Sequence, residues 1–477
     1  MVASSSRYWL DGTDARMHQE TSNHHWWSGP SGVREVLVVA LPLVISSLSW
    51  TVMTFIDRIF LRWVSGEAMS AAFSASMVWF LILCLPLGIC AYANTFVAQY
   101  FGDHQWRRIG PAVWQAIWLA VLCIPMTWLM IEWAPAIFRL ADHAPTVQQH
   151  EVTYFRSIMW GGGGMLVAQA AAAFYSGRGK TLVVMWVDTA VAIVNIGLDY
   201  LWIFGHAGFP AMGVAGAGYA TSVALWLKAA IYVGLLLQSR HRREFGTMQG
   251  MRWDGTLFWR LLYFGGPSGL QMLLDLVGFT AFVILVNRLG MVEAEATSMA
   301  FSVSTLAFMP IWGFGMAAGV LVGQRLGDDQ PMLAARATWT TLGVALTYMA
   351  VISTCYVCVP QLFLFGFDAG NQAAPNQAQV AALATSLLRY VAAYNLLDAV
   401  LTIFVNAIKG AGDTRFVFFV SLVMGTLLAA GSWLAVEILA AEIHTCWLLI
   451  TGWIWIMAAI FTARFVQGKW RNMRVIE

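Results

Sequence analysis

Five aspartates lie inside long apolar stretches of this chain, where charged side chains are rare. They are Asp57, Asp188, Asp199, Asp275 and Asp398. A carboxylate near the centre of a bilayer costs about 2.5–3.5 kcal/mol on insertion scales, so such residues usually have a function. Removal from water favours the protonated form of a carboxyl group, which suits a proton carrier. Grouped with amide and hydroxyl oxygens, the same carboxylates would suit Na⁺. The residue types therefore predict reversible binding of H⁺ or Na⁺ within a membrane.

One group of candidates falls in the first half of the chain. Asp188, Asn195 and Asp199 are spaced i, i+7 and i+11, which places them on one helical face within about 20° of each other. Neighbouring apolar segments could add a further carboxylate and neutral oxygens to this ion or proton site. The residues concerned are Asp57, Gln169 and Thr221.

A second group falls in the last part of the chain. Gln271 precedes Asp275 by four residues, and Asn395 precedes Asp398 by three, so each pair shares a helical face. Both aspartates lie near the middle of their segments and could share one cavity that binds an ion or a cationic substrate. Alternatively, some of the five acids form structural ion pairs with interior cations, for instance Asp398 with Arg389. The other interior cations are Arg58, Arg62, Arg156 and Lys228.

The segments that carry these residues are long enough to cross a bilayer. The chain has 477 residues, 59% hydrophobic and only 11% charged, whereas a soluble domain carries about 25% charged residues. Leu37 to Ile56 alone gives twenty residues without a formal charge, about the length of a spanning helix. We therefore expect an all-α integral membrane protein with twelve spans, near 35–64, 69–100, 111–138, 153–176, 182–205, 213–237, 257–289, 296–324, 333–362, 380–409, 416–437 and 445–466.

The distribution of Lys and Arg predicts the orientation of the spans. Most of the 27 basic residues, Lys409 included, fall at the chain ends and in alternate connections, whereas 205–213, 363–379 and 438–444 contain none. Basic connections stay in the cytoplasm. Both termini are therefore expected to be cytoplasmic, in a multi-pass protein of the plasma membrane, the inner membrane of a bacterium. The first thirty residues lack an apolar run of signal-peptide type, so we expect the first span to direct insertion.

The chain also contains an internal repeat. QYFGDHQ at 99–105 returns 225 residues later as QRLGDDQ at 324–330, and SGRGKT at 176–181 returns as KGAGDT at 409–414. Six spans in each half give both halves the same orientation, so we expect two lobes related by an axis along the membrane normal. The expected divisions are a cytoplasmic segment 1–32, an amino-terminal lobe 33–238, a linker 239–256, a carboxyl-terminal lobe 257–466 and a tail 467–477.

Three other patterns favour structural roles. The GRGKT motif lacks the first glycine of a phosphate-binding loop, since Phe174 stands there, and its repeat partner has lost the lysine. The Cys355–Cys358 pair lies in an apolar segment without a second pair, which favours packing over a metal site. The glycines at 161–164 predict a closely packed or flexible break in the fourth span.

Several of these runs resemble one known family. FIDRIFLRWVSG at 55–66, FVAQYFGD at 96–103, VNIGLDYLWIFGHAGFPAMGVAGAGYAT at 194–221 and NAIKGAGDT at 406–414 are similar to the multidrug and toxic compound extrusion (MATE) family. The resemblance covers about 33–466. It implies two six-helix lobes around a V-shaped cleft, and secondary active export of organic cations in exchange for H⁺ or Na⁺.

The resemblance also implies roles for individual residues. Asp57 falls on the first-helix aspartate of the family, and Asn195, Asp199 and Thr221 fall on polar positions of the DinF-like branch. Gln169 stands where that branch often has asparagine. In the second half, Asp398 falls on a tenth-helix aspartate of the NorM-like branch, and Asp275 replaces a glutamate of that branch. Acids typical of both branches leave the coupling lobe and the ion open.

Cationic drugs or dyes are the expected cargo. A lipid-linked glycan flippase of the same wider superfamily is the alternative, but it should line its cleft with basic residues to meet a pyrophosphate. The 23 Met and 24 Trp residues mostly fill helix contacts, yet such walls also suit flat cations. No His, Cys and Glu cluster indicates an enzyme, and a formal charge of +2 suggests no nucleic-acid partner. We expect a monomer in the lipid bilayer that needs no cofactor beyond its coupling ion.

Overall fold

The computed structural model describes residues 26–139, 143–368 and 377–476, and these residues form helices and connections without a β-strand. Eleven of the described helices are long and apolar enough to span a membrane. The spanning helices, with the two halves of the broken fourth span, are α2 (Val33–Val64), α3 (Gly66–Gly102), α4 (Trp106–Arg139), α5 (Pro145–Met159), α6 (Gly162–Ser176), α7 (Thr181–Phe204), α8 (Val214–Leu236), α10 (Gly255–Val286), α11 (Met291–Gly327), α12 (Pro331–Cys358), α14 (Gln377–Ala411), α15 (Thr414–Trp433) and α16 (Ile443–Val466). The shorter helices are α9 (Ser239–Glu244), η1 (Gln249–Met251), α13 (Pro360–Asp368), the π-helical turn η2 (Leu434–Ile438) and η3 (Lys469–Asn472).

The twelfth span is the fourth in chain order, and it is broken. Helices α5 and α6 have 15 residues each and are separated at Trp160 and Gly161. At this break the chain packs too closely against α8 for side chains. A Cβ on Gly161 would lie 2.7 Å from Cα of Ser222, and one on Gly164 would lie 2.9 Å from the backbone nitrogen of Trp226. Small residues allow such close helix packing. The break predicted at the glycine run is therefore confirmed, with α8 as the helix that packs against it.

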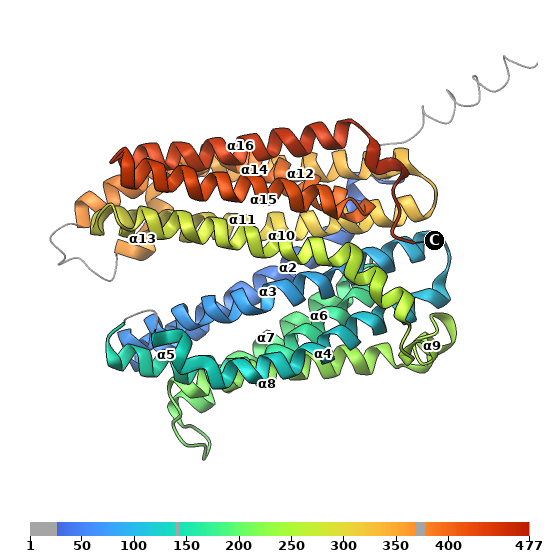
Figure 1. The fold of residues 1–477 in the computed structure, drawn as a ribbon, viewed down its shortest axis with the longest axis horizontal. Coiled ribbons are helices and arrows are strands. Elements are labelled where there is room, and N and C mark those ends of the chain that lie inside the picture. Colours follow the sequence, from blue (N-terminus) through green and yellow to red (C-terminus); the bar gives the residue numbers. More distant parts are fainter. Residues whose placement is uncertain (1–25, 140–142, 369–376, 477) are drawn as a thin grey trace, which may run out of the picture.

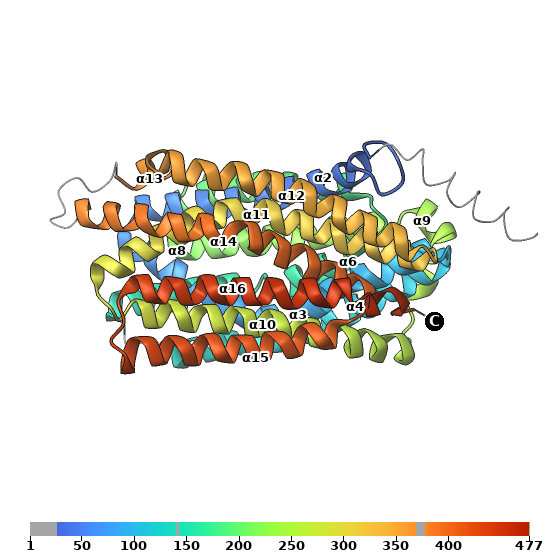
Figure 2. The same cartoon turned by 90° about the horizontal axis from the view of Figure 1, so that it is seen from above.

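The helices form two lobes that meet at one end of the molecule. In Figure 1, helices α2–α8 make up one lobe and α10–α16 the other, and the ribbons diverge away from the end that carries the C-terminus. Figure 2 shows the long helices running side by side along the molecule. Contacts between the lobes are made mainly by α2 and α3 with α10 and α11. The all-α, two-lobed fold expected from the sequence is confirmed.

The repeated QYFGDHQ and QRLGDDQ motifs build the contact between the lobes, which we call the seam. Gln99 Nε2 donates to the carbonyl oxygen of Gly410 at 3.0 Å, and Gln324 Nε2 donates to that of Gly177 at 2.8 Å. These bonds join equivalent positions of the two repeats, because each glutamine reaches the glycine turn of the opposite lobe. Arg325 and Glu35 add an ion pair of 2.6 Å across the seam.

Two equivalent glycines let the backbones approach at the seam. A Cβ on Gly102 would lie 2.8 Å from the carbonyl carbon of Gln324 and nearer still to its oxygen. A Cβ on Gly327, 225 residues later, would lie 3.0 Å from the carbonyl carbon of Gln99 and nearer still to that oxygen. The internal repeat therefore has a structural consequence, because α3 and α11 touch backbone to backbone.

The connection between the lobes packs on the amino-terminal lobe. Side chains of α4 bind it in sequence order: Trp114 Nε1 donates to the Thr247 carbonyl at 2.7 Å, and Trp118 Nε1 donates to the Met251 carbonyl at 2.9 Å. Asp254 then begins α10, accepting hydrogen bonds from the first backbone amides of that helix. We call this segment, residues 239–254, the strap, because its hydrogen bonds fix it along α4.

The GRGKT turn anchors this strap. The Arg178 guanidinium lies 3.8 Å from the ring centre of Phe174 and 4.3 Å from that of Phe245, and its Nε donates to the Phe174 carbonyl at 2.7 Å. Desolvation lowers the pKa of Arg178 to about 10, which still leaves it charged at neutral pH. The interpretation of this motif as a structural turn therefore fits its contacts.

Candidate functional site

Two predicted acids of the amino-terminal lobe lie close together, and neither forms an ion pair within the described part of the chain, although Arg58 acts on Asp57 electrostatically. Asp57 on α2 and Asp199 on α7 are 7% and 0% exposed and interact electrostatically. Within the described part of the chain, Oδ1 of each carboxyl group is buried and has no hydrogen-bond partner. Unpartnered buried oxygens are costly unless a ligand or proton satisfies them. This arrangement provides acceptors for a small cation or for H⁺.

Asn195 and Thr221 complete this cluster with neutral groups. Asn195 is fully buried on α7, and Thr221 is 6% exposed on α8. With the amide oxygen and nitrogen of Asn195 interchanged, its Nδ2 donates to Asp199 Oδ2 at 2.9 Å and its oxygen accepts from the Thr221 backbone amide at 3.2 Å. This orientation satisfies both ends of the amide, so we adopt it. We refer to Asp57, Asn195, Asp199 and Thr221 as the amino-lobe cluster.

Tyr154 contacts the amino-lobe cluster but was not predicted from the sequence. It lies on α5, is buried, and its hydroxyl donates to Asp57 Oδ2 at 3.3 Å. Asp199 also acts on it electrostatically. The only signal in the sequence was a tyrosine within the fourth span, which is common at spanning segments and indicates nothing specific.

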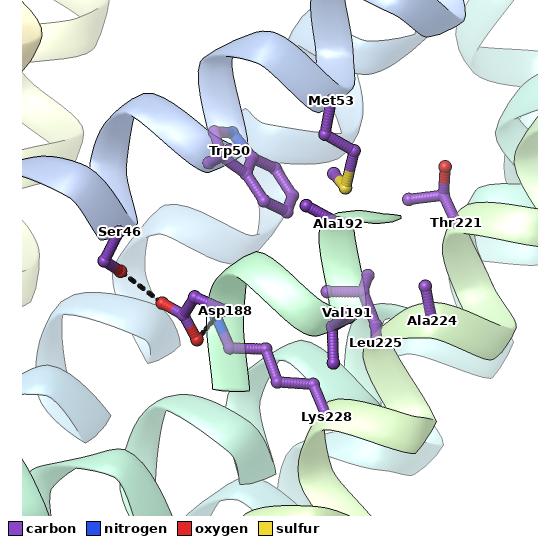
Figure 3. A pocket seen from close by; sticks show the side chains of 10 residues that line it. All are labelled: Ser46, Trp50, Met53, Asp188, Val191, Ala192, Thr221, Ala224, Leu225 and Lys228. Atoms are coloured by element: carbon purple, nitrogen blue, oxygen red, sulfur yellow. Dashed lines mark hydrogen bonds and ion pairs between the residues drawn. The ribbon is translucent and has the colours of Figure 1, made fainter. Parts of the chain in front are cut away.

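Asp188 lies apart from the amino-lobe cluster and has partners of its own, so its part in the ion site remains a prediction. It forms an ion pair with Lys228 of α8, Nζ to Oδ1 at 2.9 Å, and accepts a hydrogen bond from the Tyr232 hydroxyl at 2.9 Å. Ser46 of α2 donates to its other oxygen (Figure 3). These contacts match the alternative left open by the sequence, in which some of the acids form ion pairs with interior cations. The shared face of α7 is real, but seven residues carry Asp188 about 10 Å along the axis from Asn195.

A small cavity separates the two polar groups. Trp50 and Met53 of α2 line it, together with Thr221 at one end and Asp188 and Lys228 at the other (Figure 3). The space open to the centre of a water-sized sphere is about 20 Å³, enough for about one water molecule. Gln169 on α6 is half-buried and makes no described hydrogen bond to the amino-lobe cluster.

In the carboxyl-terminal lobe, the two predicted acids have different surroundings. Gln271 Nε2 donates to Asp275 Oδ2, and Lys409 Nζ donates to Gln271 Oε1 at 3.0 Å. Asp398 on α14 has no ion pair among the described residues, and Tyr394, one turn earlier, is the group that senses its charge. No described contact joins Asp275 to Asp398, so the expected shared cavity remains a prediction.

The neighbours of Asp398 are only partly satisfied. Asn395 is 1% exposed and its Nδ2 has no partner in the described chain. The Tyr394 hydroxyl lies 3.2 Å from Ser304 Oγ of α11. Arg389 forms no described ion pair with Asp398, and Arg58 stacks on Phe73 at 4.9 Å. Among the five interior cations considered, Lys228 is the one that pairs with a candidate acid in the described chain.

Comparison with known proteins identifies the family. The family model for MatE matches the chain twice, over residues 42–201 and 267–432. The chain belongs to the MatE family. This confirms the resemblance inferred from the motifs, and it makes the protein a MATE family transporter.

Solved MATE structures share the fold. An outward-facing multidrug resistance MATE family transporter of the MOP superfamily is 15% identical and superposes with a TM-score of 0.81, covering 93% of this chain and 97% of that one. The eukaryotic MATE transporter AtDTX14 gives 17% identity, a TM-score of 0.78 and coverage of 92% and 96%. A MOP superfamily transporter from Pyrococcus furiosus Vc1 (DSM3638) gives 16%, 0.81, and 92% and 95%, and its binding pocket has a reverse polarity that suggests a different function.

The sequence did not predict the position of the Lys409 side chain. Lys409 stands in a repeated glycine turn, and the sequence placed it with the basic residues of a connection. In the structure, the end of α14 instead turns its side chain towards Gln271, inside the lobe. This contact places a positive charge beside a predicted acid, Asp275.

Proposed function

We propose that this MATE transporter is a secondary active multidrug exporter that exchanges organic cations for H⁺ or Na⁺. The observation that carries the proposal is the pair of buried carboxylates in the amino-lobe cluster, Asp57 and Asp199, each with an Oδ1 atom that has no hydrogen-bond partner in the described chain. Two such charges repel each other at low dielectric. A proton or a cation bound between them removes that repulsion, which gives the site a reason to take up and release the coupling ion.

Both coupling ions fit the same oxygens. The free Oδ1 atoms of Asp57 and Asp199, with the Thr221 hydroxyl, could hold Na⁺, and either carboxyl group could carry H⁺. Tyr154 orients Asp57, and Asn195 orients Asp199. We therefore propose the amino-lobe cluster as the coupling site for either H⁺ or Na⁺.

The balance of interior charge favours a cationic cargo over an anionic lipid. Lys228 and Lys409 both point into the lobes, but each lies beside an acid, Asp188 or Asp275. Asp398, like the two acids of the amino-lobe cluster, forms no ion pair in the described chain. A flippase for a pyrophosphate-linked lipid would need the reverse excess. We therefore assign flat organic cations, bound against aromatic and Met side chains, as the cargo class.

The orientation of the protein in the membrane follows from the basic residues gathered at one end of the molecule. The seam, the arginine-rich strap of α9 and the C-terminus lie at one end (Figure 1). Basic segments stay in the cytoplasm, so we place both termini there, in the plasma membrane of a bacterial cell. The lobes would then be closed towards the cytoplasm and ready to release cargo outside, with the protein acting as a monomer.

Transport in vesicles tests this proposal. Purified protein in liposomes should move ethidium when a gradient of H⁺ or of Na⁺ is imposed separately, and the effective gradient identifies the ion. Asp57→Asn and Asp199→Asn should fold but lose gradient-driven movement. Glu437→Gln, which breaks an exposed ion pair with Arg288, is the matched control and should transport normally. Normal transport by both aspartate variants would exclude the assigned site.

A further inference from the structure

Lys409 is a lysine held inside the carboxyl-terminal lobe. It lies in the last turn of α14 and is half-buried. Its Nζ donates to Gln271 Oε1 at 3.0 Å, and the amide of Gln271 donates in turn to Asp275 Oδ2. The side-chain amide of Gln271 therefore bridges an ammonium group and a carboxylate. Lys409 and Asp275 also interact electrostatically, each favouring the charged form of the other.

The other charged groups near this bridge already have partners. Asp413, four residues after Lys409, forms a 2.7 Å ion pair with Arg464 of α16. The Arg415 guanidinium lies 4.0 Å from the ring centre of Tyr263 on α10. From the opposite lobe, α3 contributes the hydroxyl of Tyr92, which donates to the Lys409 carbonyl at 2.9 Å. Ser421 of α15 contributes a neutral hydroxyl beside Asp275. Asp275 is thus the acid that the Gln271 bridge links to Lys409, and its Oδ1 is buried without a hydrogen-bond partner in the described chain.

We propose that the ammonium group of Lys409 is a built-in countercharge for Asp275 and takes the place of a bound mobile cation there. Because the ammonium group is attached to the chain, it is present at Asp275 at a high effective concentration. Asp275 is thereby withdrawn from ion exchange, although its position on α10 suggested an ion or substrate site. Of the two candidate acids in this lobe, Asp398 is then the one without a countercharge among the described residues. This inference rests on the proposed export of cations and specifies which acids the cargo senses.

The proposal predicts that substitutions of Lys409 and of Asp275 change ethidium binding in opposite directions. Lys409→Gln leaves the Asp275 charge uncompensated, so ethidium should bind more tightly to the purified protein. Asp275→Asn leaves the Lys409 charge uncompensated, so ethidium should bind more weakly. Each change should be about tenfold, the size expected for one charge roughly 10 Å from a monovalent cation at an effective dielectric constant near 20. The double variant Asp275→Asn/Lys409→Gln restores neutrality and should return to within about twofold of the wild type.

The assay is equilibrium titration of ethidium fluorescence at constant pH and ionic strength, with proton release on binding as a second readout. Lys409→Gln should release more H⁺ per ethidium as pH falls, because the unmasked Asp275 can then take a proton. The double variant lacks Asp275 and should not show this additional H⁺ release. Glu437→Gln, at an exposed ion pair on the same lobe, controls for a general change of charge and should match the wild type.

Other outcomes overturn the inference. If both single variants weaken binding, or if neither changes it, the bridge is structural and Lys409 is not a countercharge for ion exchange. If a single variant does not fold, Lys409→Arg, which keeps the charge, and the neutral double variant decide: each must bind as the wild type does. If the wild-type protein binds no organic cation, the proposed function fails instead, and the two failures are therefore distinguishable.

Discussion

Closure of the seam depends on two glycines, and Gly102→Ala should open it. An added methyl group would lie 2.8 Å from the carbonyl carbon of Gln324, whereas ordinary van der Waals contact begins at 3.4 Å. Helices α3 and α11 must therefore separate by at least about 0.6 Å, and more to clear the carbonyl oxygen. Backbone atoms cannot rotate away as a flexible side chain can.

The cost follows from the bonds that this separation breaks. The hydrogen bonds of Gln99 to Gly410 and of Gln324 to Gly177 span the lobes here. A typical hydrogen bond contributes about 0.5–1.5 kcal/mol. Losing both therefore costs about 1–3 kcal/mol, which shifts the balance away from the closed seam by about five- to 150-fold.

Hydrogen exchange of the backbone amides measures this shift directly. Peptides that contain the ends of α3 and α11 should exchange faster in Gly102→Ala, and also in Gly327→Ala, its equivalent in the other repeat. Gly343→Ala on α12 is the matched control, because a Cβ there meets nothing within 4 Å. It should leave the exchange unchanged or slow it slightly, since alanine favours the helix. Wild-type exchange at the seam in both Gly102→Ala and Gly327→Ala would refute the reasoning.

Three further predictions concern single groups elsewhere. Burial lowers the pKa of His241 below 6.5, so the strap is stabilised by neutral His241 at higher pH. This stability falls as pH drops through 6.5 towards the lower, folded-state pKa, and thermal melting at pH 8 and pH 5.5 should differ less in His241→Gln. If the vesicle assay identifies H⁺ as the coupling ion, Tyr154→Phe removes the hydroxyl that competes with the proton for Asp57 Oδ2, so half-maximal ΔpH-driven efflux should need about fivefold less H⁺, equivalent to about 1 kcal/mol; an unchanged dependence would contradict the role assigned to the tyrosine. Lys228→Met leaves Asp188 unpaired, which should cost up to about 3–5 kcal/mol and lower the melting temperature, while Asp188→Asn/Lys228→Met should recover most of the loss. Equal melting of the single and double variants would show that the pair is not coupled.

Sequence by itself was sufficient for the membrane fold of this protein. A spanning segment must satisfy its backbone internally and must be about twenty apolar residues long, so composition and length identify helices directly. The repeat of QYFGDHQ and SGRGKT predicted two similar lobes, and the glycine run predicted the break between α5 and α6. The motifs were also specific enough to indicate the MATE family before the fold was known.

The tertiary structure decided which charges meet. Helical periodicity places Asp188 on the face of Asn195, but only packing against α8 shows that Lys228 neutralises it. Lys409 and Gln271 are 138 residues apart in the chain, yet they lie 3.0 Å from each other. No local pattern contains such a contact, because it depends on how rigid helices far apart in sequence pack and on where their side chains point. The sequence thus determined where the charges are buried, and the packing of the helices determined which of the described charges form pairs.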